Sequence, residues 1–184
     1  TFRNVAAGAQ RTADAWRASV AAQEFSGYVE YQDAPRPGTA GRLYARLSRV
    51  NLPQSDAHYV DGLLDQPQGD LPALDLVVDD FELRGRRLGR VEIEAQNRGG
   101  DAGPREWRLS KFNMATPEAT LTATGNWALL GQAGLEGRAT EKRTALSFKL
   151  DIRDSGDLLT RFGMPGVMRR GKGRVEGQIG WIGT

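Results

Sequence analysis

The chain has 184 residues, with 25 Lys and Arg against 23 Asp and Glu, and a formal net charge of +2. This near balance gives no reason to expect nucleic acid as a partner. The absence of cysteine excludes disulfides and thiolate metal sites, and no stretch approaches the about 18–20 apolar residues of a membrane helix. The 23 glycines and the scarcity of helix-forming runs favour β structure with many turns.

The first fifty residues predict strands after a weak beginning. Residues 1–14 are small and polar, and we expect them to be frayed or weakly helical. Alternation of apolar and polar side chains then predicts strands over 16–23, 27–31 and 41–50. We therefore assign residues 1–50 to N-terminal strands of a sheet.

Residues 51–72 interrupt this rhythm and predict an irregular crossover loop. Asn, Asp, Gln, Gly and Pro dominate the segment, which is too long for an ordinary connection. It is either a flexible crossover or a loop that holds a short helix around residues 57–64. If the chain has an internal boundary, we expect it here.

Residues 73–184 predict an antiparallel β meander with one short helix. Strand patterns separated by turn signals recur at short spacing, over residues 73–83, 88–97, 107–114, 119–127, 135–141, 144–152 and 173–181. Lys142-Arg143 resembles the tip of a hairpin. A helix is expected near 155–163, with Ser155 as its N-cap and Gly163 just after its end.

The last of these strands has a clear division between its two faces. Val175, Gly177, Ile179 and Trp181 share one face, and polar residues or glycine occupy the other. The strand over 119–127 follows the same pattern and also ends on a tryptophan. One short helix cannot cover such an apolar face. The face must therefore close on itself as a sandwich or barrel, pack on neighbouring repeats, or hold an apolar ligand.

A search for reactive groups finds no catalytic, metal or cofactor site. His58 is the single histidine and lies in the irregular loop. Asp79 and Asp80 point to opposite faces unless a bulge intervenes, and the spacing of Asp151, Asp154 and Asp157 does not match a calcium loop. The glycine-rich run 166–173 resembles a phosphate-binding loop, but it lacks the final hydroxyl and precedes a strand.

Three basic residues near the C-terminus and the four tryptophans each have both a functional and a structural interpretation. Arg169, Arg170 and Lys172 are candidates for contact with lipid headgroups, although a solvated turn explains them as well. The four tryptophans could form sugar-stacking platforms, but each belongs to a strand with periodic apolar neighbours. We therefore expect them to be buried in the core or at a sheet edge.

The order and spacing of several short motifs resemble the C-terminal part of the YhdP-type AsmA-like proteins. The match covers most of residues 71–183 and, more loosely, the strands between 16 and 47. The motifs are Leu71–Asp75, Val78–Leu83 with Arg87–Gly89, Trp107–Leu109, Ala123–Trp127, Asp154–Met164, Gly171–Gly173 and Gly177–Trp181.

This resemblance implies a Gram-negative envelope protein. Its members are anchored in the inner membrane and extend through the periplasm as a taco-like β groove with an apolar interior, thought to transport phospholipid. The present chain would be a periplasmic segment of such a protein, without its membrane anchor. The family has no catalytic motif to transfer to this chain.

We therefore predict a long, curved, mainly antiparallel β-sheet that is not an enzyme. Its partners would be phospholipid or another acyl-chain ligand and neighbouring repeats of the same longer chain, and free sheet edges could self-associate. The alternatives are an envelope scaffold with a closed β core and a carbohydrate-binding β-sandwich. The residues predicted to line the lipid groove are Val91, Ile93, Leu121, Ala123, Leu146, Phe148, Leu150, Val175 and Ile179.

Overall fold

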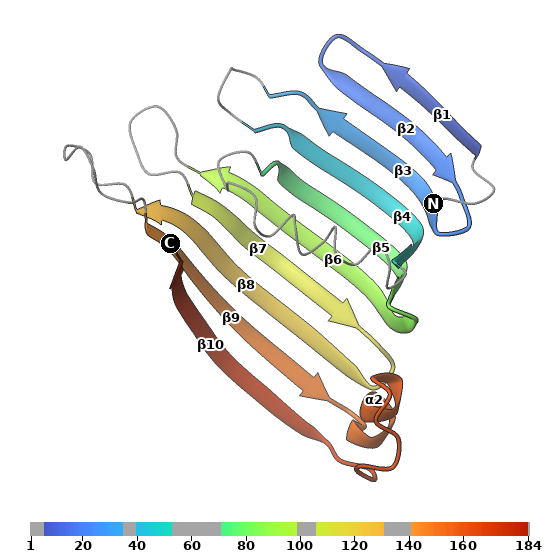
Figure 1. Ribbon diagram of the computed structural model, residues 1–184, viewed down its shortest axis with the longest axis vertical. Coiled ribbons are helices and arrows are strands. Elements are labelled where there is room, and N and C mark those ends of the chain that lie inside the picture. Colours follow the sequence, from blue (N-terminus) through green and yellow to red (C-terminus); the bar gives the residue numbers. More distant parts are fainter. Residues whose placement is uncertain (1–5, 35–39, 53–70, 99–105, 131–140, 184) are drawn as a thin grey trace.

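The described residues of the computed structural model form one open, ten-stranded sheet and one helix (Figure 1). The structure describes residues 6–34, 40–52, 71–98, 106–130 and 141–183. The elements in chain order are β1 (Ala6–Arg11), β2 (Ala15–Ala21), β3 (Phe25–Gln32), β4 (Arg42–Leu52), β5 (Ala73–Leu83), β6 (Arg86–Arg98), β7 (Glu106–Ala115), β8 (Ala119–Leu130), β9 (Glu141–Ile152), α2 (Ser155–Arg161) and β10 (Gly173–Gly183). The prediction of a mainly β fold with a helix after residue 154 is confirmed.

Strand order in the sheet is strand order in the chain, so β1 and β10 form its two edges. Every neighbouring pair is antiparallel except β4 and β5, which run in parallel. Parallel neighbours need a long crossover connection, and the long segment between Leu52 and Ala73 provides it. The sheet is therefore continuous across the segment where the sequence rhythm breaks.

Register shifts interrupt four of the strand pairs. They lie beside Gly27 in β3–β4, between Val78 and Glu82 in β5–β6, between Glu94 and Ala95 in β6–β7, and between Leu109 and Phe112 in β7–β8. An extra residue in one strand bends that strand and increases its twist. It also places the apolar residues after the extra residue on the same face as the apolar residues before it.

Gly89 allows one of the closest backbone contacts. Its φ is +76°, and a Cβ at this position would lie 2.2 Å from the carbonyl oxygen of Ala115. A side chain would therefore be strained both by the backbone conformation and by this contact. Gly8 has neither constraint, because nothing lies within 4 Å of its Cβ position.

Several sequence predictions need correction. Residues 6–11 form β1 instead of a frayed or helical segment. Lys142 and Arg143 lie inside β9, not at a hairpin tip. The strand predicted over 135–141 and the helix around 57–64 fall outside the described residues, apart from residue 141, which begins β9.

Helix α2 has well-defined caps at both ends. Its N-cap is Asp154 instead of Ser155, because the Asp154 side chain accepts a hydrogen bond from the backbone N–H of Asp157 at 3.1 Å. At the other end, Gly163 has a φ of +80°. The N–H groups of Gly163 and Met164 donate to the carbonyls of Thr160 and Leu159, as in a Schellman motif.

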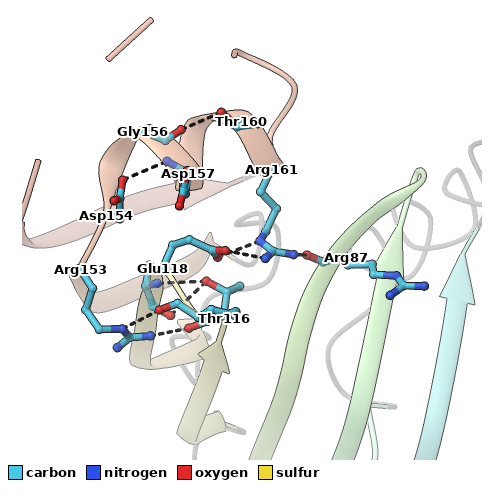
Figure 2. A network of polar contacts seen from close by, with 11 residues as sticks. Arg87, Thr116, Glu118, Arg153, Asp154, Gly156, Asp157, Thr160 and Arg161 are labelled. Atoms are coloured by element: carbon cyan, nitrogen blue, oxygen red, sulfur yellow. Dashed lines mark hydrogen bonds and ion pairs between the residues drawn. The ribbon is translucent and has the colours of Figure 1, made fainter. Parts of the chain in front are cut away.

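Arg161 joins α2 to the β7–β8 turn and to the start of β6 at one end of the sheet (Figure 2). Its guanidinium donates to both carboxylate oxygens of Glu118, at 2.8 and 2.6 Å, and to the backbone carbonyl of Arg87 at 3.1 Å. Glu118 belongs to the β7–β8 turn, and Arg87 lies at the start of β6. Arg153 also fixes the β7–β8 turn, donating to the carbonyl of Pro117 at 2.8 Å.

The Arg161 guanidinium lowers the pKa of Glu118 from 4.5 to about 2. Both side chains are largely shielded from solvent, with exposed fractions of 24% for Arg161 and 13% for Glu118. A bidentate pair in such a place is stronger than an exposed one. We infer that this ion pair is the main attachment of the end of α2 to the sheet.

We predict that Gly89→Ala destabilises the fold by about 2–4 kcal/mol, because the backbone strain and the contact with Ala115 act together. Gly8→Ala should change the free energy of unfolding by less than about 1 kcal/mol. Urea unfolding followed by circular dichroism measures both. Equal effects of the two substitutions would show that the close approach at Gly89 is unimportant.

We also predict that the Glu118–Arg161 pair makes stability depend on pH in an acidic window. Because folding lowers the pKa of Glu118, its contribution is fully present above about pH 4.5 and is lost as the pH falls towards 2. The contribution is at most about 3 kcal/mol. Urea unfolding at a series of pH values should show a weaker dependence for Glu118→Gln than for the unmodified chain. Glu176→Gln, which removes a carboxylate on β10 that is 59% exposed, is the matched control. An equally weak dependence in both variants would contradict the prediction.

Candidate functional site: the apolar face of the sheet

Strand register aligns apolar side chains in continuous rows across one face of the sheet. Residues that face each other in a pair of strands point to the same side, so a row can be followed from strand to strand. We call this surface the apolar face. The row near α2 is Leu47, Val78, Val91, Met114, Leu121, Leu150 and Val175. The central row is Val29, Ala45, Leu76, Ile93, Phe112, Ala123, Phe148 and Gly177. The next row is Tyr31, Leu43, Leu74, Ala95, Leu109, Gly125, Leu146 and Ile179.

The apolar face is buried near its middle and exposed at the β10 edge. Ala45, Leu47, Val78 and Val91 form a buried cluster on β4–β6, and Ile93, Phe112 and other half-buried side chains pack against it. On β10, Val175 is 48% exposed and Ile179 is 50% exposed. Among the described residues, no second sheet covers the apolar face. Its accessible parts therefore include β10 and, towards the other edge, Trp16 and Tyr31, which are 46% and 37% exposed.

The predicted groove residues all lie on the apolar face. Val91 belongs to the buried cluster, whereas Val175 and Ile179 are exposed and the other six are half-buried. The Phe148 ring lies over Gly177, where an added Cβ would come within 2.8 Å of it. The structure brings these residues together as one surface, and their contact with lipid stays a prediction.

The opposite face is polar, and many of its charges are paired. Glu92 accepts hydrogen bonds from Lys111 at 2.7 Å and from Arg90 at 2.9 Å, and these partners lower its pKa. On β3, the hydroxyl of Tyr28 donates to Glu30 at 2.6 Å, which is the largest cause of the lowered pKa of Glu30. Exposed pairs of this kind contribute little to stability, because water screens them. They identify this face as the one that is in contact with water.

Open hollows lie on this polar face. One of about 770 Å³ is lined by side chains of β7–β10, including Lys111, Asn113, Lys149 and Glu176. The Oδ1 atom of Asn113 is buried there without a hydrogen-bond partner among the described residues. The lining has hydroxyls and both signs of charge, and nothing in it selects a ligand class.

The candidate headgroup residues do not lie on the apolar face. Arg169, Arg170 and Lys172 belong to the segment between α2 and β10 and are exposed. Phe162, Met164, Val167 and Met168 in the same segment also expose between 38% and 69% of their surface. The structure therefore places these cations beyond the α2 end of the strands, apart from the predicted groove residues.

Three of the carboxylates considered as reactive groups make structural contacts instead. A register shift does occur at Asp79 and Asp80, and the Asp79 carboxylate accepts a hydrogen bond from Arg90. Asp151 pairs with Arg174 at 2.6 Å, and Asp154 caps α2. Within the described part of the chain, no group of three or more His, Asp or Glu side chains could hold a metal ion. His58 lies outside the described residues.

The four tryptophans share a location that the sequence analysis did not predict. Register pairs Trp16 with Tyr31, Trp107 with Trp127, and both Trp127 and Trp181 with Thr144. All four therefore lie on the apolar face, at the end away from α2. The expectation of burial is wrong for Trp16 and Trp181, which are 46% and 48% exposed. The signal was the shared ending of the 119–127 and 173–181 strands on tryptophan.

These features define a β-sheet protein whose described residues form a single layer, with one continuous apolar face and one charged face. The family model described as "YhdP protein" matches residues 1–184, so the chain belongs to the YhdP family. Family membership indicates an AsmA-like protein of the Gram-negative cell envelope. No curated protein and no solved structure matches the chain. None of the helices in the described ranges has the length and apolar character needed to cross a bilayer.

We predict that the native chain binds an apolar fluorescent dye, because Val175 and Ile179 are exposed beside half-buried apolar neighbours. Val175→Lys with Ile179→Lys should reduce the fluorescence enhancement strongly, whereas Glu176→Lys with Gln178→Lys, on the other face of β10, should not. Fluorescence titration under conditions in which circular dichroism confirms the fold measures this. Equal binding by both variants would place the dye site elsewhere.

Proposed function

We propose that this chain carries phospholipid along the apolar face of its sheet, in the periplasm between the inner and outer membranes, as part of a longer inner-membrane-anchored protein. The observation that carries the proposal is the continuity of the apolar rows across β4–β10. Membership of the YhdP family supports the location in the envelope. In this role the protein supports the barrier of the outer membrane and performs no catalysis.

The energetics of this face suit a transported lipid. Each methylene group removed from water contributes about 0.8 kcal/mol, so an acyl chain gains several kcal/mol by lying on the exposed rows. The contacts are not directional, and a chain can therefore slide from one strand to the next without breaking hydrogen bonds. Because each row crosses the strands, the direction of sliding is across the strands, over the exposed part of the apolar face.

The edge strands β1 and β10 are where we expect a second kind of partner, another β-strand, to bind. In the described part of the chain, β1 and β10 each pair with one neighbour only. An exposed strand edge is a template for another strand. Neighbouring repeats of the same longer chain at these edges would extend the apolar rows and lengthen the path for lipid. A second copy of the chain is the competing partner at the same edges.

The direct test is native mass spectrometry of the chain purified from bacterial cells without detergent, with lipid extraction in parallel. We expect bound phospholipid on the unmodified chain. Ile179→Asp should remove most of it, because a carboxylate on the apolar face opposes acyl chains, and Phe148→Asp should act in the same way. Gln178→Asp, adjacent in sequence but on the polar face, is the matched control and should retain lipid.

The alternative outcomes separate the rival functions. A chain that carries no lipid and takes up none would support an envelope scaffold. Lipid retained by both Ile179→Asp and Phe148→Asp would show that another surface binds it. Binding of oligosaccharides with a shift in tryptophan fluorescence would support the carbohydrate-binding alternative, since two tryptophans are about half exposed.

A further inference from the structure

Aromatic side chains with a polar atom are concentrated at one end of the apolar face. The sequence has four tryptophans, and strand register places all of them, together with Tyr31, at the end away from α2. We call Trp16, Tyr31, Trp107, Trp127 and Trp181 the aromatic rim. Its members come from β2, β3, β7, β8 and β10, whereas β4–β6 and β9 contribute none, and they are spread in the same direction as the apolar rows.

Contacts within the aromatic rim hold part of it in place. The Trp107 and Trp127 rings meet edge to face with their centroids 5.1 Å apart, and the indole N–H of Trp107 donates to the carbonyl of Pro72 at 3.0 Å. The guanidinium of Arg11 lies 4.8 Å from the Trp16 ring centroid. Trp181 at the β10 edge is 48% exposed, so one end of the rim is open to a ligand.

The rest of the apolar face has a different composition. Towards α2 the rows contain aliphatic, methionine and phenylalanine side chains, such as Val91, Met114 and Leu121. The other described tyrosines lie on the polar face: Tyr28 donates to Glu30, and the Tyr44 ring lies 4.2 Å from the Arg46 guanidinium. Along β2, β3, β7, β8 and β10, the apolar face therefore changes from purely apolar to amphipathic.

Indole and phenol groups are most stable where an apolar region meets a polar one. In a phospholipid this boundary is the glycerol–ester region between the headgroup and the acyl chains. We infer that a phospholipid bound to the apolar face lies along the strands, with its glycerol–headgroup region at the aromatic rim and its acyl chains extending towards α2. This inference rests on the proposed function and adds a fixed direction to the bound lipid.

The dimensions of the face agree with this arrangement. The stretch of β10 from Val175 to Trp181 is about 20 Å long at about 3.3 Å per residue. One leaflet of a bilayer accounts for about 15 Å of the hydrocarbon core, which is about 30 Å thick. Acyl chains that begin at the aromatic rim can therefore end on the apolar face before they reach α2.

One feature favours the opposite orientation of the lipid, with its headgroup at the α2 end. Arg169, Arg170 and Lys172 lie at the α2 end and would attract a phosphate. Exposed cations there are surrounded by water, however, and are separated from the apolar rows. The rim, in contrast, is continuous with those rows. The cations near α2 and the aromatic rim therefore predict opposite orientations of the bound lipid. One experiment distinguishes the two.

The experiment uses tryptophan emission and two nitroxide-labelled phosphatidylcholines, one labelled on the headgroup and one near the end of an acyl chain. The lipids are loaded from detergent, and free lipid is removed by gel filtration. In the unmodified chain every tryptophan lies at the rim, so the headgroup label should quench emission more than the chain-end label.

Two single-tryptophan variants make the comparison on one strand. Both contain Trp16→Phe, Trp107→Phe and Trp127→Phe; the first retains Trp181, and the second also contains Trp181→Phe and Val175→Trp. Positions 175 and 181 lie on the same face of β10 and are both exposed. We expect the headgroup label to quench the first variant more and the chain-end label to quench the second more. If either variant fails to fold by circular dichroism, the unmodified chain decides the orientation.

The other possible results would contradict either the orientation of the lipid or the binding of lipid itself. The reversed quenching pattern would place the headgroup at the α2 end. Equal quenching by both labels at both positions would show that bound lipid has no fixed direction, although lipid binding itself would stand. No quenching at any position, combined with no lipid by mass spectrometry, would overturn the proposed function as well.

Discussion

The continuity of strand register is the constraint on which the apolar face depends. A strand presents successive side chains to opposite faces, so a slip of one residue at any pairing would move a whole strand's apolar residues into water. In this sheet the rows stay aligned from β4 to β10. The register shifts in β5 and β7 are part of this alignment, because they restore the apolar side chains to the same face after a run that breaks the alternation. The buried cluster on β4–β6, the charged network on the other face and the aromatic rim all follow from it.

Local pattern was sufficient to predict most strands and the composition of the accessible face. Alternation between Ala119 and Trp127, and again between Gly173 and Trp181, is unbroken, and the β8–β9 and β9–β10 pairings have no register shift. For this reason the predicted residues from Leu121 to Ile179 all fall on one face. Residues 6–11 were not predicted as a strand because their side chains are small and exposed, and their strand conformation depends on pairing with β2.

Features that depend on contacts between distant parts of the chain could not be predicted from the local sequence pattern. The parallel pairing of β4 with β5 joins segments separated by a long connection, and no periodicity within either strand specifies it. The attachment of α2 depends on Arg161 meeting Glu118 and the carbonyl of Arg87, which come from distant parts of the chain. The aromatic rim could have been inferred only in part: the sequence shows tryptophan at the end of two strands, but the alignment with Trp16 and Trp107 requires the register of the whole sheet.

The single parallel pair has a consequence for how sheets of this kind can join. Because all other pairs are antiparallel, β1 and β10 run in the same direction along the two edges. Copies related by translation would therefore meet through a parallel β10–β1 joint, which is slightly less stable per residue than an antiparallel one. Two copies related by a two-fold axis perpendicular to the sheet would instead join β10 to β10 in antiparallel fashion, with both apolar faces on the same side. Such a dimer satisfies the β10 edge of both copies at once and leaves a β1 edge on each, so strand polarity favours the joining of like edges over head-to-tail joining.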